Sequence, residues 1–202
     1  MNIVLASASP RRKELLERLN IHPIIAQKNI VEKINSGELP EAVVMSLAFK
    51  KALAISMSYP DDIVIGADTI VVNDGVILGK PNDDDEAYKM LKNLSSKSHK
   101  VITGISILSQ SKGIKIIDYE STIVKFRELS DRQIKNYILT KEPLDKAGSY
   151  GIQGLGAVFV EKIDGCYFNV VGLPLSKLDN LLRKFFDYNI IWRVAKLWRT
   201  RF

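Results

Sequence analysis

The sequence predicts a single α/β domain built on a mixed β-sheet. Short apolar runs alternate with stretches in which apolar residues recur at helical spacing. Some of the apolar runs are joined by hairpin turns and others are followed by helices, a combination typical of a sheet with both antiparallel and parallel neighbours. The chain has 202 residues, 46% of them hydrophobic and 26% charged, which is enough for one domain with a sizeable core.

The first part of the chain is predicted to form a strand and two helices. The apolar run NIVLA, residues 2–6, is typical of a short buried strand. A helix follows, with Ser9 as its N-cap and Pro10 as its first residue. A second helix is expected over residues 40–57, because an apolar stripe recurs there at helical spacing: Val43, Val44, Leu47 and Ala54.

Residues 62–81 are predicted to form a β-hairpin, because two apolar runs flank the turn sequence NDG. A three-residue loop would place Asp68 opposite Lys80, whereas a two-residue turn would place Thr69 opposite Lys80. Both runs are apolar throughout, so alternation does not choose between the registers. In either register these three side chains fall near one end of the hairpin. Because an acid inside an apolar strand is costly to bury alone, Asp68 is a candidate for an ion pair or a metal ligand.

The middle of the chain is predicted to form a helix and a long strand pair. The helix is expected over residues 82–94, with Asn82 as N-cap. The acids that follow Asn82 favour a helix start over a metal site, because a helix N-terminus attracts negative charge. Two β-rich runs are then expected to pair around a turn at residues 109–113.

The last third is predicted to begin with a helix capped by Ser130. The Gly-rich run AGSYGIQGLG follows, and its glycines suit either close approach of backbone to a ligand or a tight connection between elements. Two strands, AVFVEKI and CYFNVV, are expected to meet at Asp164-Gly165. A final helix is expected over Leu175–Phe186.

The residue inventory excludes several kinds of chemistry. A single cysteine, Cys166, excludes an internal disulfide and a multi-cysteine zinc site. His22 and His99 are far apart in sequence, which disfavours a Cys/His or Ser/His nucleophile. Carboxylates, lysines and a metal are therefore the expected agents. No apolar run approaches the length of a membrane span, and the opening MNIVLASAS lacks a charged signal-peptide region, so we expect a cytoplasmic protein.

The net charge of +6 is concentrated at the C-terminus. Residues 183–202 hold six basic residues and one acid, so the body is nearly neutral and nucleic-acid binding is disfavoured. Residues 187–202 are predicted to be a basic amphipathic extension to a domain of residues 1–186. We expect contact with an anionic membrane or a partner, or packing on the domain or across a dimer interface. The apolar residues expected on one face are Ile190, Ile191, Val194, Leu197 and Trp198.

The start of the first helix carries Arg11, Arg12 and Lys13, although the positive end of a helix disfavours cations. Free backbone N–H groups, the hydroxyls of Ser7 and Ser9, and guanidiniums together would form a cradle for a polyphosphate. The alternative is a solvated helix end whose arginines pair with acids elsewhere. The excess of positive charge favours neither interpretation by itself.

These features together resemble the Maf family of nucleoside triphosphate pyrophosphatases, over the chain to about Phe186. The matching stretches are LASASPRRKELLERL, IGADTIVV, ILGKP, EPLDKAGSYGIQGLGAVFV and NVVGLPLSKL. The resemblance implies an elongated mixed sheet flanked by helices, with two lobes around a cleft as in inosine-triphosphate pyrophosphatases, and a homodimer. It also implies hydrolysis of a nucleoside triphosphate between its α- and β-phosphates, which releases pyrophosphate.

The resemblance assigns roles by position. Asp68 corresponds to the catalytic acid described as the general base, and a divalent cation, Mg²⁺ or Mn²⁺, is implied with Glu32 and Asp68 as ligands. Around Glu32 the chain keeps one acid where the family usually has several. The phosphate- and metal-binding cleft corresponds to Ser7, Arg11, Arg12, Glu32, Lys51 and Lys80. Base choice corresponds to Arg11, Thr69 and Gln153, in the pattern of the branch that prefers dTTP and UTP.

A rival hypothesis is a nucleotide-sensing regulator of cell division that acts through partner binding, since the family is associated with septum formation. A sensor needs phosphate binding but no acid that activates water. An intact Asp68–Lys80 pair therefore favours catalysis.

Overall fold

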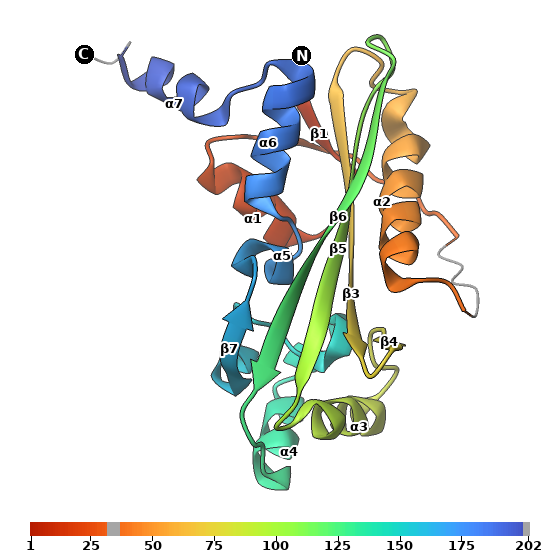
Figure 1. Cartoon of the computed structure of the whole chain (residues 1–202), viewed down its shortest axis with the longest axis vertical. Coiled ribbons are helices and arrows are strands. Elements are labelled where there is room, and N and C mark those ends of the chain that lie inside the picture. The colour runs from red at the N-terminus through yellow and green to blue at the C-terminus, as the bar shows by residue number, and fades with distance from the viewer. Residues whose placement is uncertain (32–36, 200–202) are drawn as a thin grey trace.

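The structure is a computed structural model that describes residues 1–31 and 37–199 (Figure 1). Its strands form one mixed sheet in the order β2-β1-β3-β5-β6-β7, with β4 paired to β3. β1 is parallel to β2 and to β3, and the other pairs are antiparallel. The strands are β1 (Ile3–Leu5), β2 (Ile24–Ile25), β3 (Ile63–Asn73), β4 (Val76–Leu78), β5 (Ser98–Ser109), β6 (Ile114–Phe126) and β7 (Val160–Asp164). The predicted mixed sheet is confirmed.

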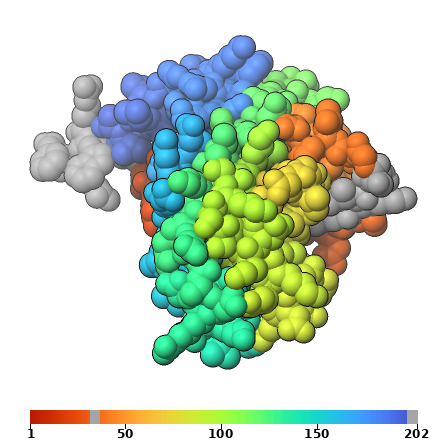
Figure 2. Space-filling model, turned by 60° about the horizontal axis from the view of Figure 1, so that its bottom comes forward, coloured from red at the N-terminus to blue at the C-terminus, as the bar shows by residue number. Residues whose placement is uncertain are grey.

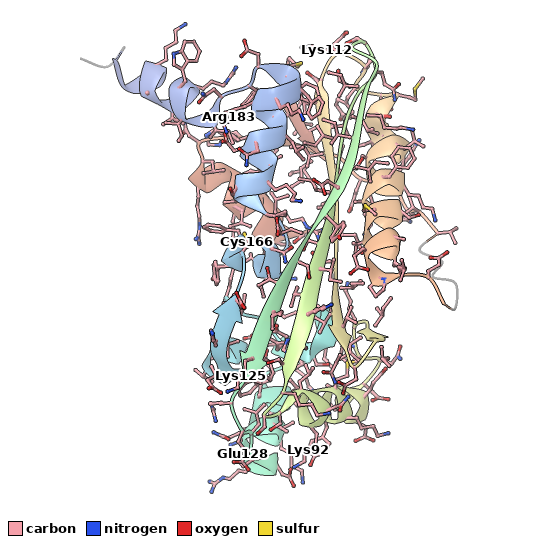
Figure 3. All side chains as sticks on the ribbon, viewed as in Figure 1. Lys92, Lys112, Lys125, Glu128, Cys166 and Arg183 are labelled. Atoms are coloured by element: carbon pink, nitrogen blue, oxygen red, sulfur yellow. The ribbon has the colours of Figure 1, made fainter. Side chains whose placement is uncertain are left out.

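Three long antiparallel strands, β3, β5 and β6, give the molecule its long axis (Figure 1). In Figure 3, Lys112 in the β5–β6 turn lies at one end of this axis, and Lys92 and Glu128 lie at the other. Figure 2 views the second end, where α3 (Asp84–Leu94) and α4 (Asp131–Leu139) come forward. The β5–β6 pairing therefore links the two ends of the molecule by backbone hydrogen bonds.

Helices cover both faces of the upper part of the sheet (Figure 1). On one face, α1 (Pro10–Arg18) and α6 (Leu175–Phe186) share a core with β1, β3 and β5. On the other face lies α2 (Pro40–Ser56). A separate core at the far end joins α3 and α4 to the lower parts of β5 and β6.

The helix α2 lies against the sheet at two glycines, Gly66 on β3 and Gly104 on β5. A Cβ atom on Gly66 would lie 2.2 Å from the carbonyl oxygen of Ala48, and one on Gly104 would lie 2.2 Å from that of Val44. Both neighbours are helix backbone, so no side-chain rotation would relieve the overlap. This close approach brings Lys51 of α2 over the same face of β3 as Asp68.

The hairpin between β3 and β4 has a two-residue turn. Asn73 pairs with Val76, and the turn residues Asp74 and Gly75 have φ values of 49° and 78°. Positive φ at both turn residues matches the twist of the flanking strands. Of the two registers open from the sequence, the structure therefore has the one that directs Thr69 toward Lys80, although β4 ends at Leu78 before reaching it.

Two segments differ from the elements expected. The run CYFNVV forms the helix α5 (Tyr167–Val171) instead of a strand, and residues 155–159 form a 3₁₀ turn ahead of β7. Gly165 and Gly172, both at φ 122°, flank α5, and this backbone conformation lets the chain change direction before and after the helix. The N-cap of α3 is Asp83 instead of Asn82, since the Asp83 carboxylate accepts the N–H of Glu86.

The N-cap predictions for two other helices have different outcomes. Ser130 caps α4 in a reciprocal capping box with Gln133, as expected for an N-cap serine. Ser9 occupies the N-cap position of α1 but makes no side-chain capping bond. The N-cap position of Ser9 is therefore confirmed, whereas its side chain does not cap the first turn of α1.

The described apolar side chains of the C-terminal helix α7 (Ile190–Arg199) differ in burial. Ile190 is 5% exposed and joins Tyr188 in the core beside α6, whereas Ile191 is 78% exposed. Ile190 therefore packs on the domain and Ile191 does not, while the side chains of Leu197 and Trp198 lie outside the described residues. No helix in the described part of the chain is long and apolar enough to cross a membrane. The membrane or partner role of this segment stays a prediction.

We predict that Gly66→Ala destabilises the fold by about 3 kcal/mol, because the new methyl group overlaps helix backbone and overpacking costs about 1–3 kcal/mol or more. Urea unfolding monitored by circular dichroism measures the change. Gly79→Ala is the matched control, since a Cβ there meets nothing within 4 Å. Equal stability of the two variants would contradict the close packing of α2 on β3.

Candidate active site

A cleft of about 870 Å³ opens at a gap in the edge of β3. On this edge β1 pairs with residues 63–65 and β4 pairs with residues 71–73, which leaves the stretch between them facing the cleft. The volume falls in the range of about 300–1,000 Å³ typical of small-molecule sites. The cleft therefore lies between the ends of β1 and β4, which pair with different parts of β3.

The structure brings together eight of the nine residues singled out from the sequence. Those lining the cleft are Ser7, Arg11, Arg12, Lys51, Asp68, Thr69, Lys80 and Gln153. The ninth, Glu32, lies outside the described residues. The individual roles of all nine stay predictions.

The cleft is strongly basic. Its described lining holds six cationic side chains and only two carboxylates, those of Asp68 and Asp145. The charge of a nearly neutral body is thus unevenly distributed, with an excess of positive charge inside a concave site. Such a site attracts a polyanion, because low-dielectric walls strengthen its field. The cationic residues are Arg11, Arg12, Lys28, Lys51, Lys80 and Lys146.

Asp68 forms an ion pair with Lys51, whose Nζ lies 2.5 Å from the aspartate Oδ1. The two side chains are only 13% and 20% exposed, so the pair lies within the wall of the cleft. The ion pair that the hairpin suggested, between Asp68 and Lys80, is not formed among the described residues, and Lys80 lines the cleft instead. Lys51 carries no strong local signal in the sequence, because a lysine on an amphipathic helix is normally a solvated position.

Arg12 connects three parts of the chain beneath the cleft. Its side chain is buried, and it donates from Nε to the carbonyl of Gly172 at 2.8 Å, from Nη1 to Ser7 Oγ at 3.0 Å and from Nη2 to Thr69 Oγ1 at 3.0 Å. A guanidinium has five N–H donors, so these contacts use much of its capacity. Arg12 therefore positions the walls of the cleft as well as adding charge to it.

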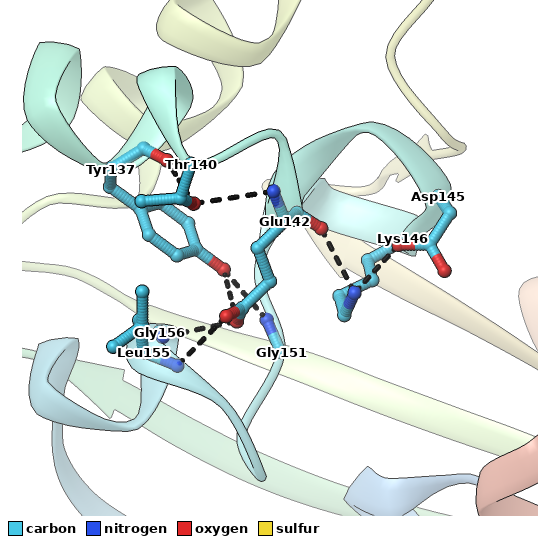
Figure 4. A network of polar contacts seen from close by, with 8 residues as sticks. All are labelled: Tyr137, Thr140, Glu142, Asp145, Lys146, Gly151, Leu155 and Gly156. Carbon is cyan, nitrogen blue, oxygen red and sulfur yellow. Dashed lines mark hydrogen bonds and ion pairs between the residues drawn. The ribbon is translucent and has the colours of Figure 1, made fainter.

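Glu142, which the sequence analysis did not single out, organises the loop that carries Gln153 (Figure 4). Its carboxylate accepts the N–H of Leu155 at 2.9 Å, the N–H of Gly156 at 3.3 Å and the hydroxyl of Tyr137 at 2.8 Å. Burial raises the pKa of Glu142, but these three donors outweigh it and the net pKa is lowered. The carboxylate is thus held charged. A glutamate just ahead of a Gly-rich run was the available signal.

The glycines of this loop make room for Glu142 and its neighbours. A Cβ on Gly154 would lie 2.4 Å from a Glu142 carboxylate oxygen, and one on Gly156 would lie 2.7 Å from the Tyr137 hydroxyl. At Gly151 the nearest atom is in the side chain of Lys146, at 2.6 Å. Of the two interpretations left open for the Gly-rich run, the structure supports a tight connection at these positions.

At the mouth of the cleft, Lys146 donates to Asp145 Oδ1 at 2.6 Å and to the carbonyl of Glu142 at 2.9 Å. Burial raises the pKa of Asp145, while the hydrogen bond and charge of Lys146 and the charge of Arg11 lower it more. The charge of Arg11 thus contributes to lowering the pKa of Asp145 at this end of the cleft. The helix-start arginines consequently have separate environments, Arg12 within the wall and Arg11 nearer the opening.

The donor set for a divalent cation is small in the described part of the chain. No group of three or more histidine, cysteine, aspartate or glutamate side chains is close enough there to hold a metal. Asp68 contributes one carboxylate, and its Oδ1 already pairs with Lys51. Protein-bound Mg²⁺ commonly takes one or two carboxylates together with waters and substrate phosphates. The residues present fit a cation of that kind better than one held by protein ligands alone.

Comparison with known proteins agrees with this geometry. Residues 2–185 match the Maf-like protein family. The chain belongs to this family. It is 52% identical over 194 residues to the dTTP/UTP pyrophosphatase of Clostridioides difficile, covering 96% of this chain and 100% of the relative. It is 50% identical over 183 residues to that of Bacillus cereus (strain G9842), covering 91% and 95%.

Two solved structures are more distantly similar. A HAM1 protein from Coxiella burnetii is 13% identical with a TM-score of 0.47, covering 91% of this chain and 99% of that chain. The Ham1 protein of Staphylococcus aureus is 12% identical with a TM-score of 0.43, covering 62% and 72%. The similarity of neither structure is high enough for a comparison of sites.

We predict that Glu142→Gln lowers the free energy of unfolding by about 2 kcal/mol, because the new amide NH₂ meets N–H donors and a charge-assisted network is lost. Equilibrium urea unfolding is the measurement. Glu161→Gln serves as control, since Glu161 forms an exposed ion pair with Lys125 and such pairs contribute about 0–1 kcal/mol. A smaller effect at Glu142 than at Glu161 would contradict the assigned network.

His99 lies behind Tyr150, a residue of the cleft wall, and its Nε2 is 2.8 Å from the tyrosine hydroxyl. Burial lowers the pKa of His99 to about 4 from an ordinary 6.5. Between these values the unfolded chain binds the proton and the folded chain does not. Stability therefore falls as the pH drops through this window.

We predict that acidification from pH 7 to pH 4 costs the wild-type protein roughly 3 kcal/mol through His99, and that His99→Gln removes this contribution. Urea unfolding at a series of pH values measures, for both proteins, how the free energy of unfolding changes with pH. Parallel slopes would show that His99 titrates alike in the folded and unfolded chains.

Proposed function

We propose that this protein hydrolyses nucleoside triphosphates between the α- and β-phosphates, giving the monophosphate and pyrophosphate, with dTTP and UTP as preferred substrates. The observation that carries the proposal is the basic cleft with the Asp68–Lys51 pair in its wall. Relatives at about half identity over nearly the whole chain are named dTTP/UTP pyrophosphatases, which supports the same reaction here. The comparisons do not favour the alternative of a division regulator without catalysis.

In this proposal the residues of the cleft have different roles. Lys51, Lys80 and Arg11 neutralise phosphate oxygens, which lets a nucleophile approach a crowded polyanion. Asp68 orients a water molecule and takes its proton as the water attacks the α-phosphorus. Lys51 holds Oδ1 of Asp68, which orients the carboxylate in the wall of the cleft. Pyrophosphate leaves with the bonding electron pair.

A divalent cation, Mg²⁺ or Mn²⁺, forms part of this proposal. Asp68 and Glu32 are the residues that would hold it, together with phosphate oxygens and waters. When bound, such a cation supplies charge neutralisation on the phosphates. The homodimer and the cytoplasmic location implied by the family resemblance also remain proposals.

The preference for dTTP and UTP is assigned to the loop that Glu142 organises. Gln153 lines the cleft at the end of this loop, and its amide offers both a donor and an acceptor. Uracil and thymine present an acceptor at O4 and a donor at N3–H. The fixed loop backbone would therefore let one side chain read both groups.

The test is a panel of nucleoside triphosphates with Mg²⁺ or Mn²⁺, scored for pyrophosphate release by the wild-type protein and by Asp68→Asn. We predict that the variant loses about 10²–10⁴-fold in kcat, the usual contribution of a general base, and still binds nucleotide. Asp118→Asn is the control, because Asp118 pairs with Lys177 on the surface of β6. Wild-type turnover by the Asp68 variant, or preference for a purine triphosphate, would overturn the proposal.

We further predict that chelation by EDTA abolishes pyrophosphate release and that added Mg²⁺ or Mn²⁺ restores it, because in the proposal a divalent cation supplies part of the positive charge that neutralises the reacting phosphates. The same assay measures this. Full activity after exhaustive chelation would refute the requirement for a cation and would leave the lysines and arginines as the agents of neutralisation.

A further inference from the structure

A chain of hydrogen bonds runs from the cleft wall into the core behind it. Thr69, which lines the cleft, lies opposite Thr103 in the β3–β5 ladder, and their Oγ1 atoms are 2.9 Å apart. Thr103 is fully buried, and its hydroxyl lies 2.9 Å from the main-chain carbonyl oxygen of Asn169 on α5. Arg12 donates to Thr69 Oγ1 from the other direction at 3.0 Å.

The directions of these hydrogen bonds follow from the groups involved. A carbonyl oxygen only accepts, so the single hydroxyl hydrogen of Thr103 is donated to Asn169. The 2.9 Å contact between the two threonines then needs the hydrogen of Thr69. One lone pair of Thr69 Oγ1 already accepts from Arg12. Thr69 consequently has no hydrogen left for a ligand and offers the cleft one remaining lone pair.

The carbonyl of Asn169 is held in place by the rest of that residue. Its fully buried side chain donates from Nδ2 to the carbonyl of Val101 and to Thr122 Oγ1, both at 2.9 Å. Thr122 in turn bonds both the N–H and the carbonyl of Cys166, where α5 begins. These contacts fix α5 on β5 and β6, which keeps the acceptor for Thr103 at its position.

We propose that Thr103 is a positioning residue that sets Thr69 as a hydrogen-bond acceptor toward the cleft, and that this acceptor receives an N–H or O–H of the nucleoside half of the substrate. The proposal rests on the proposed function for the identity of that substrate. Phosphate oxygens are excluded as the partner of this lone pair, because they are themselves acceptors. The N3–H of uracil or thymine fits it if Gln153 reads only O4, and a sugar hydroxyl fits it if Gln153 reads both groups of the base edge, whereas N3 of cytosine is an acceptor and does not fit.

The test compares Thr103→Val with Thr103→Ser. Valine has the shape of threonine without its hydroxyl, so Thr69 loses its internal acceptor and its hydrogen is free to turn into the cleft. Serine keeps the hydroxyl. The measurement is kcat/KM for UTP, CTP, dUTP and 3′-deoxyuridine triphosphate, together with dissociation constants of non-hydrolysable analogues of the same nucleotides. A ratio between two nucleotides on one protein does not depend on the folded fraction.

With Thr103→Val we expect one ratio to fall about tenfold, the value of one hydrogen bond gained or lost, while Thr103→Ser keeps the wild-type ratios. A change in UTP over CTP assigns the lone pair to the base. A change in UTP over dUTP or over the 3′-deoxy nucleotide assigns it to the sugar. In a Thr69→Val background, adding Thr103→Val should change none of these ratios, because the group through which Thr103 acts is absent.

Three results would overturn the proposal: unchanged ratios in Thr103→Val, equal shifts in the valine and serine variants, or a further shift in the double variant. The dissociation constants distinguish failure of the proposed reaction from failure of the proposed role of Thr103. If the wild-type protein releases no pyrophosphate, the proposed reaction fails, and the ratios of dissociation constants still show whether Thr103 governs recognition of the nucleoside.

Discussion

The cleft depends on a buried guanidinium. Arg12 joins the loop after β1, the middle of β3 and the end of α5 through three hydrogen bonds of 2.8–3.0 Å. Burying a charge is costly without partners, so this arrangement ties those segments to one geometry. Gly172 belongs to the same constraint, because a Cβ there would lie 3.3 Å from Thr69 Oγ1. The wall of the cleft is thus fixed before any ligand enters.

This constraint explains how a nearly neutral body carries a strongly basic site. Arg12 contributes its charge from within the wall, while Lys51 is brought over β3 by the backbone contact of α2 at Gly66 and Gly104. Burial of each cation costs free energy of desolvation, and hydrogen bonds to fixed partners offset this cost. The net charge of the sequence does not report such clustering, because residues distant in the chain supply it.

The sequence predicted most of the fold from local signals. Helix starts at Pro10 and Pro40, the hairpin turn within the sequence NDG and the N-cap at Ser130 all lie where turn and cap chemistry places them. Local patterns also indicated part of the cleft, namely the helix start with Arg11 and Arg12 and the hairpin end with Asp68. Lys51 and Gln153 were assigned by family resemblance. The pairing of Asp68 was not predictable, since whether it meets Lys51 or Lys80 depends on where β4 ends and how closely α2 packs.

The misassigned run CYFNVV shows why local propensity fails at such a site. Its residues favour a strand, but Asn169 has fully buried donors satisfied by Val101 and Thr122, and a helical turn between Gly165 and Gly172 is the conformation that delivers them. The same turn aims the carbonyl of Asn169 at Thr103 and that of Gly172 at Arg12. Tertiary hydrogen bonding outweighs propensity here because a strand would move the carbonyl groups of Gly172 and Asn169 away from Arg12 and Thr103.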